Sequence, residues 1–152
     1  GQKELREVLQ FVPAPLRNLL SFNLSAVPDG APLGRVSELG VFLHGFGTHL
    51  SIDLEAGLPA SVYSDLVGKY AEADVHFISF RLPDVMDGTI LRDATRVIEK
   101  AKQHGLGGAV RNLCDRAFLS PLVAAGYEYI AGPAIGEPSR HIPAPWRPDD
   151  FL

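Results

Sequence analysis

The sequence contains very little cysteine. Cys114 is the only one among 152 residues. A single thiol excludes a disulfide within the chain and a cysteine-based zinc site, because each of these needs more than one cysteine. Scarce cysteine is also typical of proteins kept in a reducing compartment. We therefore expect a cytoplasmic protein.

Long apolar runs are missing as well. No stretch approaches the roughly 18 consecutive apolar residues that a membrane-spanning helix needs. The start of the chain lacks the basic and then apolar pattern of a signal peptide. We therefore expect no direct insertion into a membrane. Gly1 stands where a natural chain has Met, which suggests either a residue left by expression or a piece of a longer protein.

There is no excess of positive charge. The formal net charge is −4, and the 14 lysine and arginine residues are scattered along the chain. A protein that binds nucleic acid through its phosphates normally shows a clustered basic stripe. The sequence therefore argues against a nucleic-acid partner.

The sequence does contain ordinary material for one globular domain, with 46% hydrophobic and 21% charged residues. A chain of this size buries roughly two thirds of its unfolded surface when it folds. Residues 1–138 are predicted to form an α/β domain of about five βα units. Residues 139–152 are rich in proline and are predicted to be a tail.

Apolar residues recur at spacings that predict alternating strands and helices. The clearest helix is 88–104, where an apolar stripe runs to a stop at Gly105. The other predicted helices are 2–11, 61–70 and 115–125, and the predicted strands are 19–25, 49–54, 75–80, 108–111 and 128–131. Strands that alternate with helices predict a parallel sheet. Since a complete barrel needs about 250 residues, we expect a partial, TIM-barrel-like α/β fold.

One segment, 33–46, fits two structures. Val36, Leu39 and Leu43 have the spacing of a helix, whereas Val41, Phe42 and Leu43 form an apolar run of strand length. Periodicity alone does not choose between the two for so short a run.

The stretch AGYEYIAGPAIGEP (125–138) resembles the end of EAL domains, the cyclic-di-GMP phosphodiesterase family. In that family a small residue and a glycine precede an acidic residue, an aromatic residue and a Gln-Gly pair. Earlier stretches follow the order of the family's strand-end motifs: FNLSA (22–26), GTHLSIDL (47–54), FISFRLPDV (77–85) and GLGGAVRNLCD (105–115). The resemblance covers about residues 17–138 and implies the C-terminal part of an EAL-type barrel.

The resemblance implies a chemistry in which carboxylates and amides at strand ends hold two divalent cations, which activate a water to attack a phosphodiester. In this chain the matching positions are mostly replaced. The residues that fall on them are Asn23, Asp53, Ser79, Arg81, Arg111 and Cys114. Only Asp53 keeps a carboxylate, and the two arginines would repel cations. The resemblance therefore implies a vestigial site with no metal, no cofactor and no catalytic residue, in a chain that is not an enzyme.

The residues at these positions are still compatible with binding of a nucleotide. The planar guanidinium groups of Arg81 and Arg111 match phosphate oxygens, so a cyclic-di-GMP receptor without hydrolysis is one alternative. The simpler interpretation is that each arginine pairs with a nearby carboxylate, such as Asp84 or Asp115.

A further alternative is an α/β-hydrolase-like enzyme. His44-Gly45-Phe46-Gly47 looks like the oxyanion loop of that family. The Gly-x-Ser-x-Gly turn that carries the family's nucleophile is replaced by residues 112–116, NLCDR. Cys114 would have to act instead, with His141 and Asp149. A small apolar thiol at a strand end is the simpler interpretation of Cys114.

The 5 histidines show no metal-ligand spacing on any single predicted element. The sequence therefore predicts a catalytically inactive, EAL-like regulatory module of bacterial signalling. It would act by contact with a protein partner or by dimerisation, because the unpaired edges of a partial barrel are places where another strand can pair.

Overall fold

The chain folds around one parallel sheet. The computed structural model describes residues 2–17, 20–25, 27, 32–47 and 49–136. Within them the strands pair in the order β1-β2-β3-β4-β5, and every neighbouring pair is parallel. Their bounds are β1 Ser21–Leu24, β2 His49–Glu55, β3 Phe77–Arg81, β4 Gly107–Arg111 and β5 Tyr129–Ile130.

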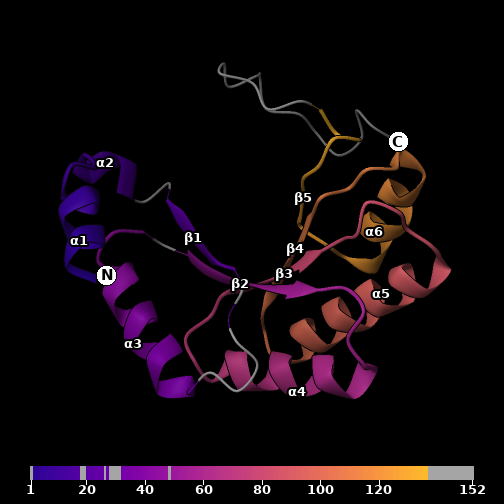
Figure 1. Ribbon diagram of the computed structural model, residues 1–152, viewed down its shortest axis with the longest axis horizontal. Helices are drawn as coiled ribbons and strands as arrows, with labels where there is room; N and C mark the ends of the chain where they lie inside the picture. Colours follow the sequence, from indigo (N-terminus) through magenta and orange to yellow (C-terminus); the bar gives the residue numbers. More distant parts are fainter. Residues whose placement is uncertain (1, 18–19, 26, 28–31, 48, 137–152) are drawn as a thin grey trace.

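Helices alternate with the strands and cover one face of the sheet. They are α1 Gln2–Gln10, α2 Ala14–Arg17, α3 Leu33–His44, α4 Ala60–Ala71, α5 Gly88–Gln103, the 3₁₀ turn η1 Arg116–Phe118, and α6 Leu119–Ala125. In Figure 1, α3 to α6 form an outer arc and the strands form an inner arc, with no described helix on the concave side. The predicted fold class is confirmed: it is α/β, with five parallel strands in a partial TIM-barrel-like arrangement.

The two faces of the sheet differ because successive side chains of a strand point to opposite sides. The convex face, toward the helices, is apolar: its side chains include Leu50, Ile52, Leu54, Ile78, Phe80 and Val110, each no more than 4% exposed. These side chains share one core with the buried positions of α4 and α5, which are Tyr63, Val67, Tyr70, Ala94, Val97, Ile98 and Ala101. Burial of this apolar surface is the main stabilising term of the fold.

Segment 33–46, for which two structures were open, is helical from Leu33 to His44. Its buried positions, Val36, Gly40 and Leu43, have helical spacing. Gly40 lets α3 lie close to the sheet, since a Cβ at this position would be 3.3 Å from Leu50 Cδ2. Packing against β2 therefore selects the helix.

Helix α5 agrees with its prediction to within one residue. Asp87 caps its start: Oδ1 accepts hydrogen bonds from the backbone N–H groups of Thr89 at 2.8 Å and Ile90 at 2.9 Å. Gly105 follows its end with a φ of 73°, a left-handed conformation that suits glycine. Both ends are thus determined locally.

The other elements differ from prediction mainly at their ends. The strand expected from residue 75 begins at Phe77, and the helix expected over 115–125 is divided into η1 and α6. Helix α2 was not predicted, because Pro13 and Pro15 suggested only the end of a helix. Proline is tolerated in the first turn of a new helix, where its missing N–H costs nothing.

The predicted tail, 139–152, lies outside the described residues, as does the predicted domain end at residue 138. Among the described residues, no helix combines the length and the apolar character needed to cross a membrane.

Replacing Asp87 with alanine tests the helix cap. The two hydrogen bonds to Asp87 hold the pKa of its carboxyl below its ordinary value. Their contribution is therefore present at neutral pH and is lost as the pH falls through the lowered pKa. We expect Asp87→Ala to lower the urea concentration at the unfolding midpoint at neutral pH, because two helix N–H groups lose their acceptor. Glu99→Ala, on the exposed side of α5, is the control. An equal loss in both variants would contradict the cap.

Candidate functional site

The carboxyl ends of the strands form one edge of the sheet, which is where parallel α/β folds place their ligands. The concave face carries Asn23, Asp53, Ser79, Arg81 and Arg111 at this edge. Strand pairing fixes their positions, with Asp53 opposite Ser79 and Arg81 opposite Arg111. These five are the carboxyl-edge cluster. All were singled out from the sequence, and the fold brings them together.

Asp53 is the centre of the cluster. Its Oδ2 atom accepts hydrogen bonds from Arg111 Nη1 at 2.7 Å and from Ser25 Oγ at 2.7 Å. The Asp53 side chain is 3% exposed, against 47% for that of Arg111. Its other oxygen, Oδ1, is buried without a hydrogen-bond partner among the described residues. A buried carboxylate with one bare oxygen still has the capacity to accept a hydrogen bond.

Ser51 belongs to the same network, although the sequence did not single it out. Its hydroxyl donates to Asn23 Oδ1 at 2.6 Å, and Asn23 Nδ2 is 3.2 Å from Ser25 Oγ. These contacts join β1 to β2 on the concave face. The alternation in β2 was the available signal, because Ser51 and Asp53 lie two residues apart and so share a face.

Ser79 is almost fully buried, at 2% exposure, and its Oγ atom has no hydrogen-bond partner among the described residues. Because it lies opposite Asp53, the cluster holds two buried polar groups with bonding capacity left. Such groups are rare in folded proteins, and each one calls for an explanation.

The loops beyond this edge are held together by Asn112. Its side-chain amide donates to Leu82 O and to Asp84 Oδ1, both at 3.0 Å. Asn112 itself has a φ of 64°, a conformation that asparagine adopts more readily than most residues. The loops after β3 and β4 are therefore tied to each other beside Arg81 and Arg111.

Two hollows have Glu55, at this edge, in their lining. One, of about 280 Å³, is lined by Val27, Asp53, Leu54, Glu55, Leu58, Leu66 and Tyr70. The other, of about 180 Å³, is lined by Glu55, Ala56, Arg81, Leu82 and Pro83. The loop after β2 is held by Tyr63, whose hydroxyl donates to Glu55 O at 2.9 Å and accepts from the Leu58 N–H at 3.0 Å. Burial raises the pKa of this hydroxyl. Tyr63 thereby fixes the loop that borders both hollows.

Cys114, the sixth residue singled out, is not part of the cluster. It is exposed in the loop after β4, and its Sγ atom is 3.7 Å from Asn112 Oδ1. His141 and Asp149, its suggested catalytic partners, lie outside the described residues.

The candidate oxyanion loop lies at the other edge of the sheet. His44 is the last residue of α3, so the motif follows a helix and not a strand. Residues 44–47 lead into the amino end of β2, whereas Cys114 follows the carboxyl end of β4. Because the strands are parallel, the two parts of the suggested hydrolase site are at opposite edges. Burial lowers the pKa of His76, which is a neighbour of His44.

No protein-family model and no curated protein matches the chain. Among solved structures, the chain is similar to thiamine phosphate pyrophosphorylase from Pyrococcus furiosus. The TM-score is 0.34 and the sequence identity is 10%, over 86% of this chain and 78% of that chain. A likeness of this degree carries no argument about chemistry.

These comparisons correct two predictions. The EAL family assignment is wrong, since no family model matches and the similar solved structure is a differently named protein. It depended on a short terminal motif and on spacing, which any series of βα units of similar length reproduces. The prediction that the chain is not an enzyme is contradicted as well, since it rested on positions carried over from that family.

Proposed function

We propose that the carboxyl-edge cluster binds a small anionic molecule that also carries hydroxyl groups, such as a phosphate ester. The observation that supports this most directly is the position of Arg81 beside Arg111 on neighbouring strands of the concave face. Both arginines are exposed, and Arg81 forms no ion pair with any described residue.

The two arginines have hydrogen-bond donors that no described contact uses. A guanidinium group carries five N–H bonds in a planar fork that matches phosphate oxygens. Arg111 uses Nη1 on Asp53, which leaves its remaining donors available for a ligand. Like charges on neighbouring strands of one face repel each other. Asp53 offsets part of this repulsion, and a bound anion would offset more.

The buried polar atoms favour a ligand that also donates hydrogen bonds. Asp53 Oδ1 and Ser79 Oγ lie on the same face as the arginines and can accept from a hydroxyl group. Glu55 lies opposite Arg81 and adds a second negative charge to that of Asp53. Because both carboxylates repel further negative charge, a single phosphate with neighbouring hydroxyls fits better than a polyphosphate.

Arg81→Gln is the variant that tests this function. Arg81 supports no described ion pair, so we expect its loss to weaken ligand binding about tenfold or more without affecting the fold. Binding is measured by isothermal titration at low salt with inorganic phosphate, a sugar phosphate and cyclic-di-GMP. The ligand mixtures are then chromatographed, so that turnover is detected as well.

Arg92→Gln is the matched control. Arg92 is exposed on α5, and its described hydrogen bond is with Thr89 of the same helix. Arg111→Gln is unsuitable because it would leave the buried Asp53 carboxylate without its cation. Absence of binding by the unaltered protein, or equal weakening in both variants, would reject the proposal.

A second candidate function is self-association through the open sheet. Strands β1 and β5 stand at the two ends of the strand order, and each has one neighbour among the described strands. An unpaired strand edge is a template for another strand. Tyr129, at the β5 edge, is 60% exposed and contacts the Phe77 ring on the concave face. A second copy that places its β1 against this β5 would continue the parallel sheet.

Sedimentation across the micromolar concentration range tests self-association. We expect a monomer–dimer equilibrium, because pairing of two short edges buries little area and gives weak association. Tyr129→Arg should weaken the dimer about tenfold, whereas Ala124→Arg, on the exposed side of α6, should not. A monomer at every concentration would eliminate this candidate.

A further inference from the structure

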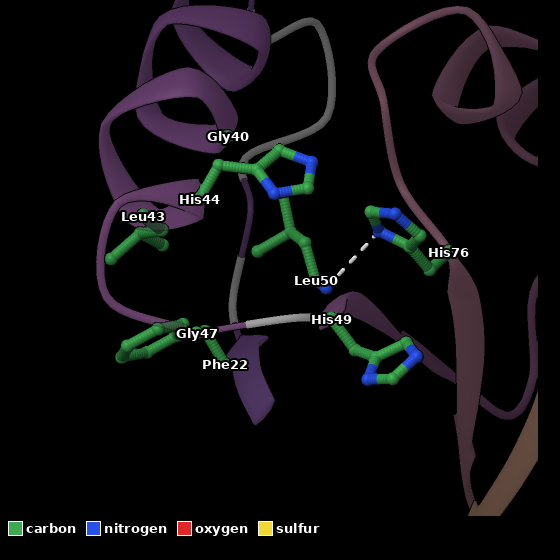
Figure 2. A pocket seen from close by; sticks show the side chains of 8 residues that line it. All are labelled: Phe22, Gly40, Leu43, His44, Gly47, His49, Leu50 and His76. Atoms are coloured by element: carbon green, nitrogen blue, oxygen red, sulfur yellow. Dashed lines mark hydrogen bonds between the residues drawn. The ribbon is translucent and has the colours of Figure 1, made fainter. Parts of the chain in front are cut away.

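The amino-terminal edge of the sheet holds a second group of polar side chains, which the sequence analysis did not connect. His44, Asp74 and His76 each offer one ligand atom, and these three atoms lie within 4.8 Å of one another. His44 ends α3, while Asp74 and His76 lie between α4 and β3. Figure 2 shows the rings of His44 and His76 turned toward each other beside Leu50. We call these three residues the histidine triangle.

The fold fixes His76 through two backbone contacts to β2. The backbone N–H of His76 donates to Leu50 O at 2.8 Å, and the ring atom Nδ1 of His76 accepts from the backbone N–H of Leu50 at 3.3 Å. Figure 2 marks the second of these contacts with a dashed line. The ring therefore has a set direction relative to the sheet.

His44 and Asp74 complete the triangle from the opposite side. His44 Nε2 is 3.0 Å from Asp74 Oδ2, and the rings of His44 and His76 meet edge to face with centroids 5.3 Å apart. Asp74 adopts a φ of 58°, a conformation that few non-glycine residues occupy but that aspartate tolerates. This turn brings its carboxylate to the histidines.

We propose that the histidine triangle binds a divalent transition-metal ion of the Zn²⁺ type. Two imidazole nitrogens and one carboxylate oxygen are a donor set that suits zinc, cobalt, nickel and ferrous iron. Calcium and magnesium prefer oxygen ligands alone. The side chains of His44 and Asp74 are 45% and 56% exposed, so an ion could enter from solvent and keep a coordination position open to water.

His49 is the neighbour that could be mistaken for a fourth ligand. Its ring centroid is 5.6 Å from that of His76 and 5.4 Å from that of Phe77, and it is not one of the three converging ligands. His49→Gln therefore serves as a local control that alters the surroundings but leaves the triangle intact.

Metal binding has a cost at Leu50. An ion held by Nδ1 of His76 replaces the hydrogen bond from the Leu50 N–H, and an ion held by Nε2 requires a proton on Nδ1, which faces that same N–H. In either case the bond is lost. We therefore expect micromolar affinity, weaker than that of structural zinc sites, and a metal-dependent shift of the Leu50 amide resonance.

The test titrates ZnCl₂ into the tag-free chain by calorimetry and CoCl₂ with visible absorption as the readout. We expect one equivalent of metal to bind. The visible absorption bands of bound Co²⁺ should be those of an ion with fewer than six ligands, and the Leu50 amide resonance should shift in NMR spectra. His44→Gln and His76→Gln should each weaken binding about tenfold or more, while His49→Gln and His104→Gln, which alter none of the three converging ligands, should not.

Thermal melting of each variant without metal separates loss of a ligand from loss of the fold. Asp74→Asn, which retains the turn, tests the carboxylate independently of the imidazoles. The proposal is overturned if the unaltered chain binds no ion, or if His76→Gln binds as tightly as His104→Gln.

Discussion

Parallel pairing of strands taken in sequence order is the constraint on which the rest of this structure depends. It places all the carboxyl ends at one edge and all the amino ends at the other. Because side chains alternate along a strand, the same pairing separates an apolar convex face from a more polar concave face. The helices cover only the first. The core, the carboxyl-edge cluster and the histidine triangle all follow from this arrangement.

The two edges of the sheet have different chemistry for a structural reason. At the carboxyl edge, Asp53 is buried and is balanced by Arg111, so polar groups are held in fixed positions under an exposed arginine pair. At the amino edge, His44 and Asp74 are about half exposed and come from the ends of helices and turns. The first arrangement suits recognition of a molecule by directed hydrogen bonds, and the second suits an ion with exchangeable water.

The sequence predicted the fold class, because period-2 alternation is a local feature. The five residues of the carboxyl-edge cluster were singled out through the resemblance to EAL domains, whose motifs lie at strand ends. It did not reveal Ser51, whose hydroxyl matters only once Asn23 of another strand lies beside it. The family assignment failed because repeated βα units share their spacing whatever their chemistry. The histidine triangle escaped notice because His44 lies on α3, whereas Asp74 and His76 share the segment between α4 and β3, and only folding brings His44 to them.

By itself, the sequence determined the alternation of strands and helices and the ends of α5, since Asp87 and Gly105 act on backbone groups a few residues away. Tertiary structure alone decided that 33–44 is a helix, because its apolar residues fit either period and only packing against β2 distinguishes them. It also decided which polar groups meet. Two contacts join different elements: Asp53 with Arg111, and His44 with Asp74. The distances in both pairs depend on how the strands pair and on how the helices cover the sheet.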